Sequence, residues 1–180
     1  MPSGPGVIPE DLIKTIVGLL PPGVSSFLLT SKQDAESIID QQRRVRVSTL
    51  QLVDTVSVDV YGMLRSALPG ISIVQVIHVS GKESVEEAHA VESFVHALLL
   101  DSGNPSLPVK QLGGTGRTHD WNISRKIREA VNVPVYLAGG LTPENVSRAI
   151  DEVGPFGLDV CNGVRTHGAL DEEKLSLFFD

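Results

Sequence analysis

The 180-residue sequence contains one cysteine, Cys161, and few aromatic residues, which make up 4% of the chain. One cysteine excludes an internal disulfide and fits a reducing compartment, so we expect a cytoplasmic protein. With so few aromatic side chains, valine, leucine, isoleucine and alanine must build the core from a hydrophobic content of 41%. Such a composition is typical of buried parallel strands that are covered by helices.

Long apolar runs and an excess of positive charge are also missing. No stretch approaches the ~20 apolar residues of a membrane span. Glu10, Asp11 and Lys14 interrupt the first apolar stretch, which therefore does not resemble a signal peptide. A formal net charge of −7 disfavours surfaces for nucleic acids or anionic membranes. We therefore expect neither as a partner, although local backbone amides can still bind a phosphate group.

Helical and extended patterns alternate along the whole chain. Strands are predicted at residues 24–30, 48–53, 71–79, 94–100, 133–137 and 158–161. Helices are predicted to begin near Pro9, Asp34, Val58, Ser84, Asn122, Thr142 and Glu172. At the fourth helix, Ser84 and Glu87 form a capping-box pattern. Strict alternation predicts an α/β fold with a parallel sheet, as one domain over residues 1–180.

Three glycine-bearing turns follow predicted strands and lead towards helices. They read Leu112-Gly-Gly-Thr-Gly-Arg-Thr-His-Asp-Trp121, Leu137-Ala-Gly-Gly-Leu-Thr-Pro-Glu-Asn-Val146 and Asp159-Val-Cys-Asn-Gly-Val164. Turns of this kind expose backbone N–H groups to an anion. Each glycine pair alone is also compatible with a simple tight turn, and Thr142-Pro143 with a helix cap. Together they favour phosphate binding, with these candidate residues: Gly113, Gly114, Thr115, Gly139, Gly140, Asn162 and Gly163.

The order and content of these turns resemble the C-terminal half of the phosphoribosylanthranilate isomerases, which are TIM-type β/α barrels of tryptophan biosynthesis. The resemblance is strong from about Leu98 onwards. The first helix and Leu20-Pro-Pro-Gly-Val24 look like the second barrel helix and the turn into the third strand. This implies a parallel β/α barrel truncated to about six β/α units, with open sheet edges. We expect a second copy, an altered closure or an N-terminal piece to cover them, and the apolar residues Leu175, Phe178 and Phe179 agree with this.

The resemblance assigns Asp120 the role of general acid in an Amadori-type aldose–ketose isomerisation of a phosphoribosyl amine. No cofactor or metal is implied. In the family motif Gly-Gly-Thr-Gly-x-x-Phe-Asp-Trp, Gly114 and Thr115 would shape the floor of the site, and His119 replaces the usual Phe. Asp120 is equally suited to be the N-cap of the helix at Asn122. Both roles are compatible with one another.

The general base is not identified, because the family's Lys-x-Cys-Gly motif is absent. Cys161, at the end of the last predicted strand, is interpreted as a small buried residue at the phosphate corner. His78 and His119 are alternative bases, although each is also compatible with an ordinary histidine. Arg117 or Arg165 would supply positive charge. Two hypotheses remain: an isomerase, or a catalytically silent homologue that binds a phosphosugar or a partner.

Overall fold

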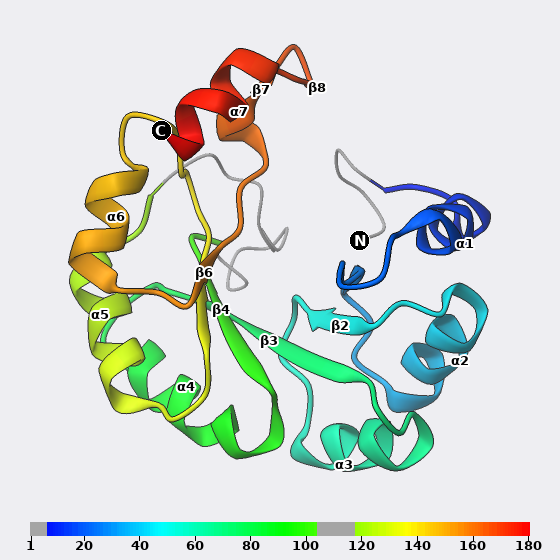
Figure 1. The fold of residues 1–180 in the computed structure, drawn as a ribbon. Helices are drawn as coiled ribbons and strands as arrows, with labels where there is room; N and C mark the ends of the chain where they lie inside the picture. The colour runs from blue at the N-terminus through cyan, green and yellow to red at the C-terminus, as the bar shows by residue number, and fades with distance from the viewer. Residues whose placement is uncertain (1–6, 104–117) are drawn as a thin grey trace. The chain divides into compact units, whose positions relative to one another are not determined.

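The computed structural model describes residues 7–103 and 118–180, and the chain divides into two compact units. Of the described residues, the first unit contains 7–76 and 94–96, and the second contains 77–93, 97–103 and 118–180. The α-helices and strands alternate along the chain from α1 to β6 (Figure 1). The strand β3 contributes residues to both units.

The first unit is built from parallel strands that alternate with helices. Its elements are α1 (Glu10–Leu19), β1 (Phe27–Thr30), α2 (Ala35–Val45), β2 (Thr49–Leu52), α3 (Val58–Ala67) and most of β3 (Ser72–His78). The strand order is β1-β2-β3, with Leu50 opposite both Leu28 and Ile73. Asp34 caps α2 as its position in the sequence predicts, since its carboxylate accepts a hydrogen bond from Ser37 N at 2.8 Å.

The second unit repeats this pattern and contains the carboxyl ends of three neighbouring parallel strands. Its elements are the end of β3, α4 (Glu83–Val91), β4 (Ala97–Asp101), α5 (Trp121–Ala130), β5 (Val135–Leu137), α6 (Val146–Val153), β6 (Gly157–Leu158), η2 (Asn162–Val164), β7 (Arg165–Thr166), β8 (Ala169–Leu170) and α7 (Glu172–Phe179). The strand order is β4-β5-β6. Leu98, Leu100, Leu137 and Ala149 are fully buried in its core.

Three sequence predictions differ from the structure. Ser84 does not cap α4, because it lies inside the helix, fully buried, and its Oγ accepts a hydrogen bond from Ser80 N. Phe94 is not in a strand, because Glu92–Phe94 form a 3-10 turn (η1) and β4 begins at Ala97. The last parallel strand is only Gly157–Leu158, so Cys161 lies beyond it. The antiparallel hairpin β7–β8 was not predicted.

Apolar side chains are exposed at both ends of the strand order. At β1, Phe27 and Leu29 are 40% and 46% exposed, and α1 contains no buried residue. Beyond β6, Phe178 of α7 is buried whereas Phe179 is 80% exposed. The prediction of apolar surface in this last helix therefore holds for Phe179 and is wrong for Phe178.

Candidate active site

A cavity of about 290 Å³ lies at the carboxyl ends of the strands in the second unit. The turn after β5 and the segment after β6 form most of its wall, and Asp101 at the end of β4 completes it. Parallel strands place the loops that follow them at one edge of the sheet, which is where α/β proteins bind ligands. The lining residues are Asp101, Ala138, Gly139, Gly140, Leu141, Thr142, Asp159, Val160, Cys161, Asn162 and Gly163.

Two glycines allow the backbone conformation of the turn after β5, and the side chain of one asparagine stabilises the turn by hydrogen bonds. Gly139 and Gly140 have φ angles of 84° and 64°, in the left-handed region that favours glycine. Asn145 accepts a hydrogen bond from Thr142 N at 2.9 Å and donates one to Gly140 O at 2.9 Å. Sequence reasoning missed Asn145. Its only signal is an asparagine three residues after Thr142, a spacing that lets a side chain bond back to the turn.

Gly163 allows the segment after β6 to pass against the turn after β5. A Cβ atom at this position would collide with the carbonyl oxygen of Leu141. The glycine is therefore required by a close approach of two backbones, in addition to any role towards a ligand. Consequently Gly139, Gly140, Asn162 and Gly163 all line one cavity, although they come from two turns.

Two carboxyl groups at strand ends, Asp101 and Asp159, also line the cavity and were not predicted as site residues. Burial raises the pKa of Asp159, and the neighbouring charge of Asp101 raises it further. Asp159 as a whole residue is nonetheless exposed to solvent, so the rise in its pKa is limited. Among the lining residues of the described chain there is no lysine or arginine.

Asp120 lies directly before α5 and acts as its N-cap. Its Oδ1 accepts hydrogen bonds from Asn122 N at 2.9 Å and Asn122 Nδ2 at 3.1 Å. These bonds hold the pKa of Asp120 below its ordinary value. The capping interpretation is thus confirmed, and the ligand-facing role stays a prediction, because Asp120 does not line the cavity. The candidates Gly113, Gly114 and Thr115 lie outside the described residues.

The alternative bases and the cysteine have different surroundings. His78 is buried at the end of β3, and its backbone carbonyl accepts a hydrogen bond from Ser84 Oγ. His119 Nε2 is 2.7 Å from Ser124 Oγ, at the start of α5. Cys161 lines the cavity, but the interpretation of a buried residue is wrong, because the short β6 strand ends before it and leaves the thiol exposed.

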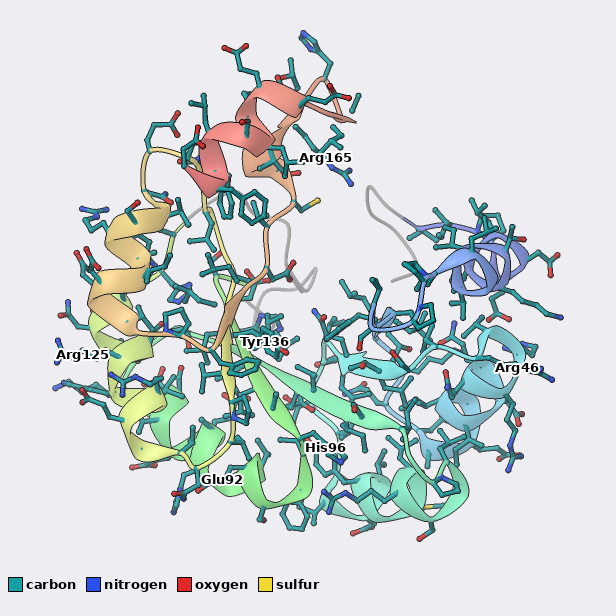
Figure 2. All side chains as sticks on the ribbon, in the orientation of Figure 1. Arg46, Glu92, His96, Arg125, Tyr136 and Arg165 are labelled. Carbon is teal, nitrogen blue, oxygen red and sulfur yellow. The ribbon has the colours of Figure 1, made fainter. Side chains whose placement is uncertain are left out.

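Arg165 is exposed on β7 (Figure 2). Its backbone carbonyl accepts a hydrogen bond from Lys174 of α7. It does not line the cavity. Arg117 lies outside the described residues. Within residues 7–103 and 118–180, no group of three or more histidine, cysteine or acidic side chains is arranged to hold a metal ion. No helix in that part of the chain has the length and apolar character to cross a bilayer.

Comparison with known proteins gives consistent matches. The family model "N-(5'phosphoribosyl)anthranilate (PRA) isomerase" matches residues 29–180. N-(5'-phosphoribosyl)anthranilate isomerase 2 of Methanosarcina mazei is 40% identical over 172 residues, which cover 95% of this chain and 75% of that protein. The corresponding isomerase of Methanocella arvoryzae is 36% identical, over 89% of this chain and 73% of the relative.

Solved structures agree with the sequence relatives. Phosphoribosyl anthranilate isomerase from Thermotoga maritima superimposes with a TM-score of 0.80 at 29% identity, over 99% of this chain and 82% of that structure. A phosphoribosyl anthranilate isomerase in complex with reduced 1-(o-carboxyphenylamino)-1-deoxyribulose 5-phosphate has a TM-score of 0.77 at 27% identity, over 98% and 80%. The predicted α/β fold of the TIM-barrel type is confirmed.

Proposed function

Because this chain belongs to the N-(5'-phosphoribosyl)anthranilate isomerase family, we propose that it isomerises N-(5'-phosphoribosyl)anthranilate in tryptophan biosynthesis. The observation that carries this proposal is the cavity in which Gly139, Gly140, Asn162 and Gly163 come together. Backbone N–H groups of such turns suit a phosphate group. A relative bound to a deoxyribulose 5-phosphate compound supports a phosphorylated substrate of the same kind.

In this proposal Asp120 is the general acid. It donates a proton to the ring oxygen of the ribose, the bond from C1′ to that oxygen breaks, and a protonated Schiff base forms between C1′ and the nitrogen. A base then removes the proton from C2′, and the electron pair forms the C1′=C2′ double bond of the enolamine. Protonation at C1′ and loss of the proton from the C2′ hydroxyl give the ketose. The base remains unassigned. Neighbouring negative charge raises the pKa of a carboxyl group, so an anionic substrate beside Asp120 would favour its proton-donating form.

Two carboxylates lie beside the turns that we propose bind the phosphate group, and they would favour the sugar part of the substrate. Asp101 and Asp159 accept hydrogen bonds when ionised, which suits the hydroxyl groups of a sugar. Their negative charge disfavours the binding of an anionic group directly beside them. We therefore place the phosphate group at Gly139, Gly140 and Gly163, with the sugar hydroxyls towards the carboxylates.

The proposal is tested by the fluorescence decrease of phosphoribosylanthranilate with wild type, Asp120→Asn and Asp151→Asn. Asparagine caps helices as well as aspartate does, so Asp120→Asn keeps the start of α5 while removing the acid. We expect Asp120→Asn to lower kcat by about 10²- to 10⁴-fold. Asp151, exposed on α6 outside the cavity, is the matched control and should leave kcat unchanged.

Two results would contradict the isomerase proposal. Full activity in Asp120→Asn would show that Asp120 is not the general acid. A wild-type chain that binds the reduced deoxyribulose 5-phosphate compound without any turnover would instead establish a catalytically silent binding protein.

We also propose that a second copy of the chain or another partner covers the β1 edge. Phe27 and Leu29 of β1 and Leu19 of α1 are large apolar side chains exposed there, and such surfaces favour association. Sedimentation equilibrium of the purified chain measures its oligomeric state. A monomer at all concentrations, with no partner required for activity, would contradict this part of the proposal.

A further inference from the structure

His119 lies where three elements of the second unit meet. It precedes Asp120 directly, and its Nε2 is 2.7 Å from Ser124 Oγ of α5. Its Nδ1 is 3.1 Å from the position that a Cβ of Gly139 would occupy, and so are the backbone nitrogen and Oγ of Ser102. The imidazole therefore packs between the end of β4, the glycine turn after β5 and the first turn of α5.

The polar ring has a cost that an apolar ring of similar shape would avoid. Nδ1 of His119 is buried and has no hydrogen-bond partner among the described residues. A buried nitrogen without a hydrogen-bond partner destabilises the folded protein. The motif that this segment resembles has phenylalanine at this position, which fills the space without that cost. Unlike phenylalanine, histidine can form a hydrogen bond through Nε2 to the hydroxyl group of Ser124, a fully buried residue.

Charged groups around His119 come from two of the segments packed against it. Burial lowers the pKa of His119, while Asp101 at the end of β4 and the adjacent Asp120 act in the opposite direction. Gly139 and Ser124 bring no charge. The ring is therefore neutral at neutral pH, with one nitrogen protonated. In the tautomer whose Nε2 donates to Ser124 Oγ, protonation of Nδ1 would place a new donor against Gly139 and Ser102 and would change how the ring packs.

We propose that His119 is a positioning residue, whose imidazole fixes the segment carrying Asp120 relative to the Gly139 turn. The hydrogen bond to Ser124 holds the ring at the start of α5, and the packing against Gly139 sets its distance from the phosphate-binding turn. This inference rests on the function proposed above, because it concerns the spacing between the acid and the phosphate site. Misplacement by about 1 Å costs on the order of 10²-fold in rate.

The link that His119 makes between the Asp120 segment and the Gly139 turn is measured first by NMR, which does not require catalytic turnover. The backbone amide signals of Asp120 and Gly139 are followed from pH 8 to pH 5 in wild type and in His119→Phe. We expect both signals to titrate with one midpoint below 6.5, the ordinary histidine value, and both to lose that titration in His119→Phe. His89→Phe, an exposed position on α4, is the control and should change neither midpoint. A response of only one of the two signals contradicts the proposal.

The role in catalysis is measured with His119→Phe, His119→Gln and Ser124→Ala. We expect kcat to fall about 10- to 100-fold in His119→Phe and in Ser124→Ala, with a smaller change in KM. The double variant should be no slower than the slower single variant, since both remove one interaction. Glutamine places an amide nitrogen near Nε2 and should recover much of kcat. Wild-type kcat in His119→Phe, or losses that multiply in the double variant, would overturn the proposal.

A wild-type chain without turnover would contradict the proposed function and not the coupling itself. The NMR titration then decides whether His119 links the two segments. Denaturation midpoints of all variants separate a general loss of stability from a loss of positioning, because a merely structural role would lower stability without removing the shared titration.

Discussion

At the scale of single residues, the glycines of the cavity serve different physical purposes. Gly139 and Gly140 adopt left-handed backbone angles, whereas Gly163 is needed because a side chain would meet the carbonyl oxygen of Leu141. Gly62 in α3 has neither constraint: nothing lies within 4 Å of a Cβ placed there. The same substitution to alanine should therefore have opposite effects at positions 163 and 62.

We expect Gly163→Ala to destabilise the protein by about 1–3 kcal/mol, because the added methyl group forces two backbone segments apart. Gly62→Ala should stabilise it by up to about 1 kcal/mol, since alanine is the better helix former. Urea denaturation measures both, and phosphate binding to Gly163→Ala reports whether the cavity has opened. Equal stability of Gly163→Ala and wild type would contradict the close approach of the two turns.

Residue-level reasoning from the sequence found the backbone features of the cavity better than its acidic groups. The pattern predicts turns that expose backbone N–H groups, because the residues concerned follow predicted strands: Gly139, Gly140, Asn162 and Gly163. Asp159 lies inside the predicted strand at residues 158–161, whereas in the structure it follows the shorter β6. Only the three-dimensional structure shows that Asp101 lies close enough to raise its pKa.

At the scale of helices and strands, the ends of elements depend on hydrogen bonds that sequence patterns show only in part. Asp34 was predicted to open α2 and does so, because an aspartate before an apolar helical pattern has one strong local use. Ser84 has the same kind of pattern but lies within α4, where its hydroxyl group forms hydrogen bonds with Ser80 N and His78 O. Tertiary contacts thus override a local capping signal.

The cap at Asp34 predicts an acid-sensitive contribution to stability. Hydrogen bonds from Ser37 lower the pKa of Asp34 in the folded protein. The stabilisation is therefore complete above the unfolded value of 3.8, and is lost as the pH falls through the lower folded pKa. In Asp34→Asn the cap remains but this pH dependence disappears. We expect the difference in urea midpoint between wild type and Asp34→Asn to change between pH 5 and pH 2, the acid range over which such a group titrates.

The control for this measurement is Asp40→Asn, an exposed position on the same helix. It removes one charge from α2 without touching the cap. A pH dependence that changes as much in Asp40→Asn as in Asp34→Asn would show that net charge, and not the capping hydrogen bond, determines the acid response.

At the scale of the whole chain, alternation predicted the parallel α/β fold but not its division into two compact units. Sequence periodicity reports on local elements, whereas this division depends on which contacts form between distant segments. The strand β3 has residues in both units, Ser72 to Val76 in the first and Ile77 and His78 in the second. A strand shared in this way is expected to make unfolding cooperative, and one domain over residues 1–180 stays a prediction.

The single tryptophan, Trp121, tests that cooperativity because it lies in the second unit. Leu50 is fully buried in the first unit, so Leu50→Ala should destabilise by about 2–5 kcal/mol. If residues 1–180 unfold as one domain, the urea transition seen by Trp121 fluorescence should shift as far as the transition seen by far-UV circular dichroism. Met63→Ala, at a position 54% exposed on α3, should shift neither by much. A Trp121 transition that stays at its wild-type midpoint in Leu50→Ala would show that the two units unfold independently.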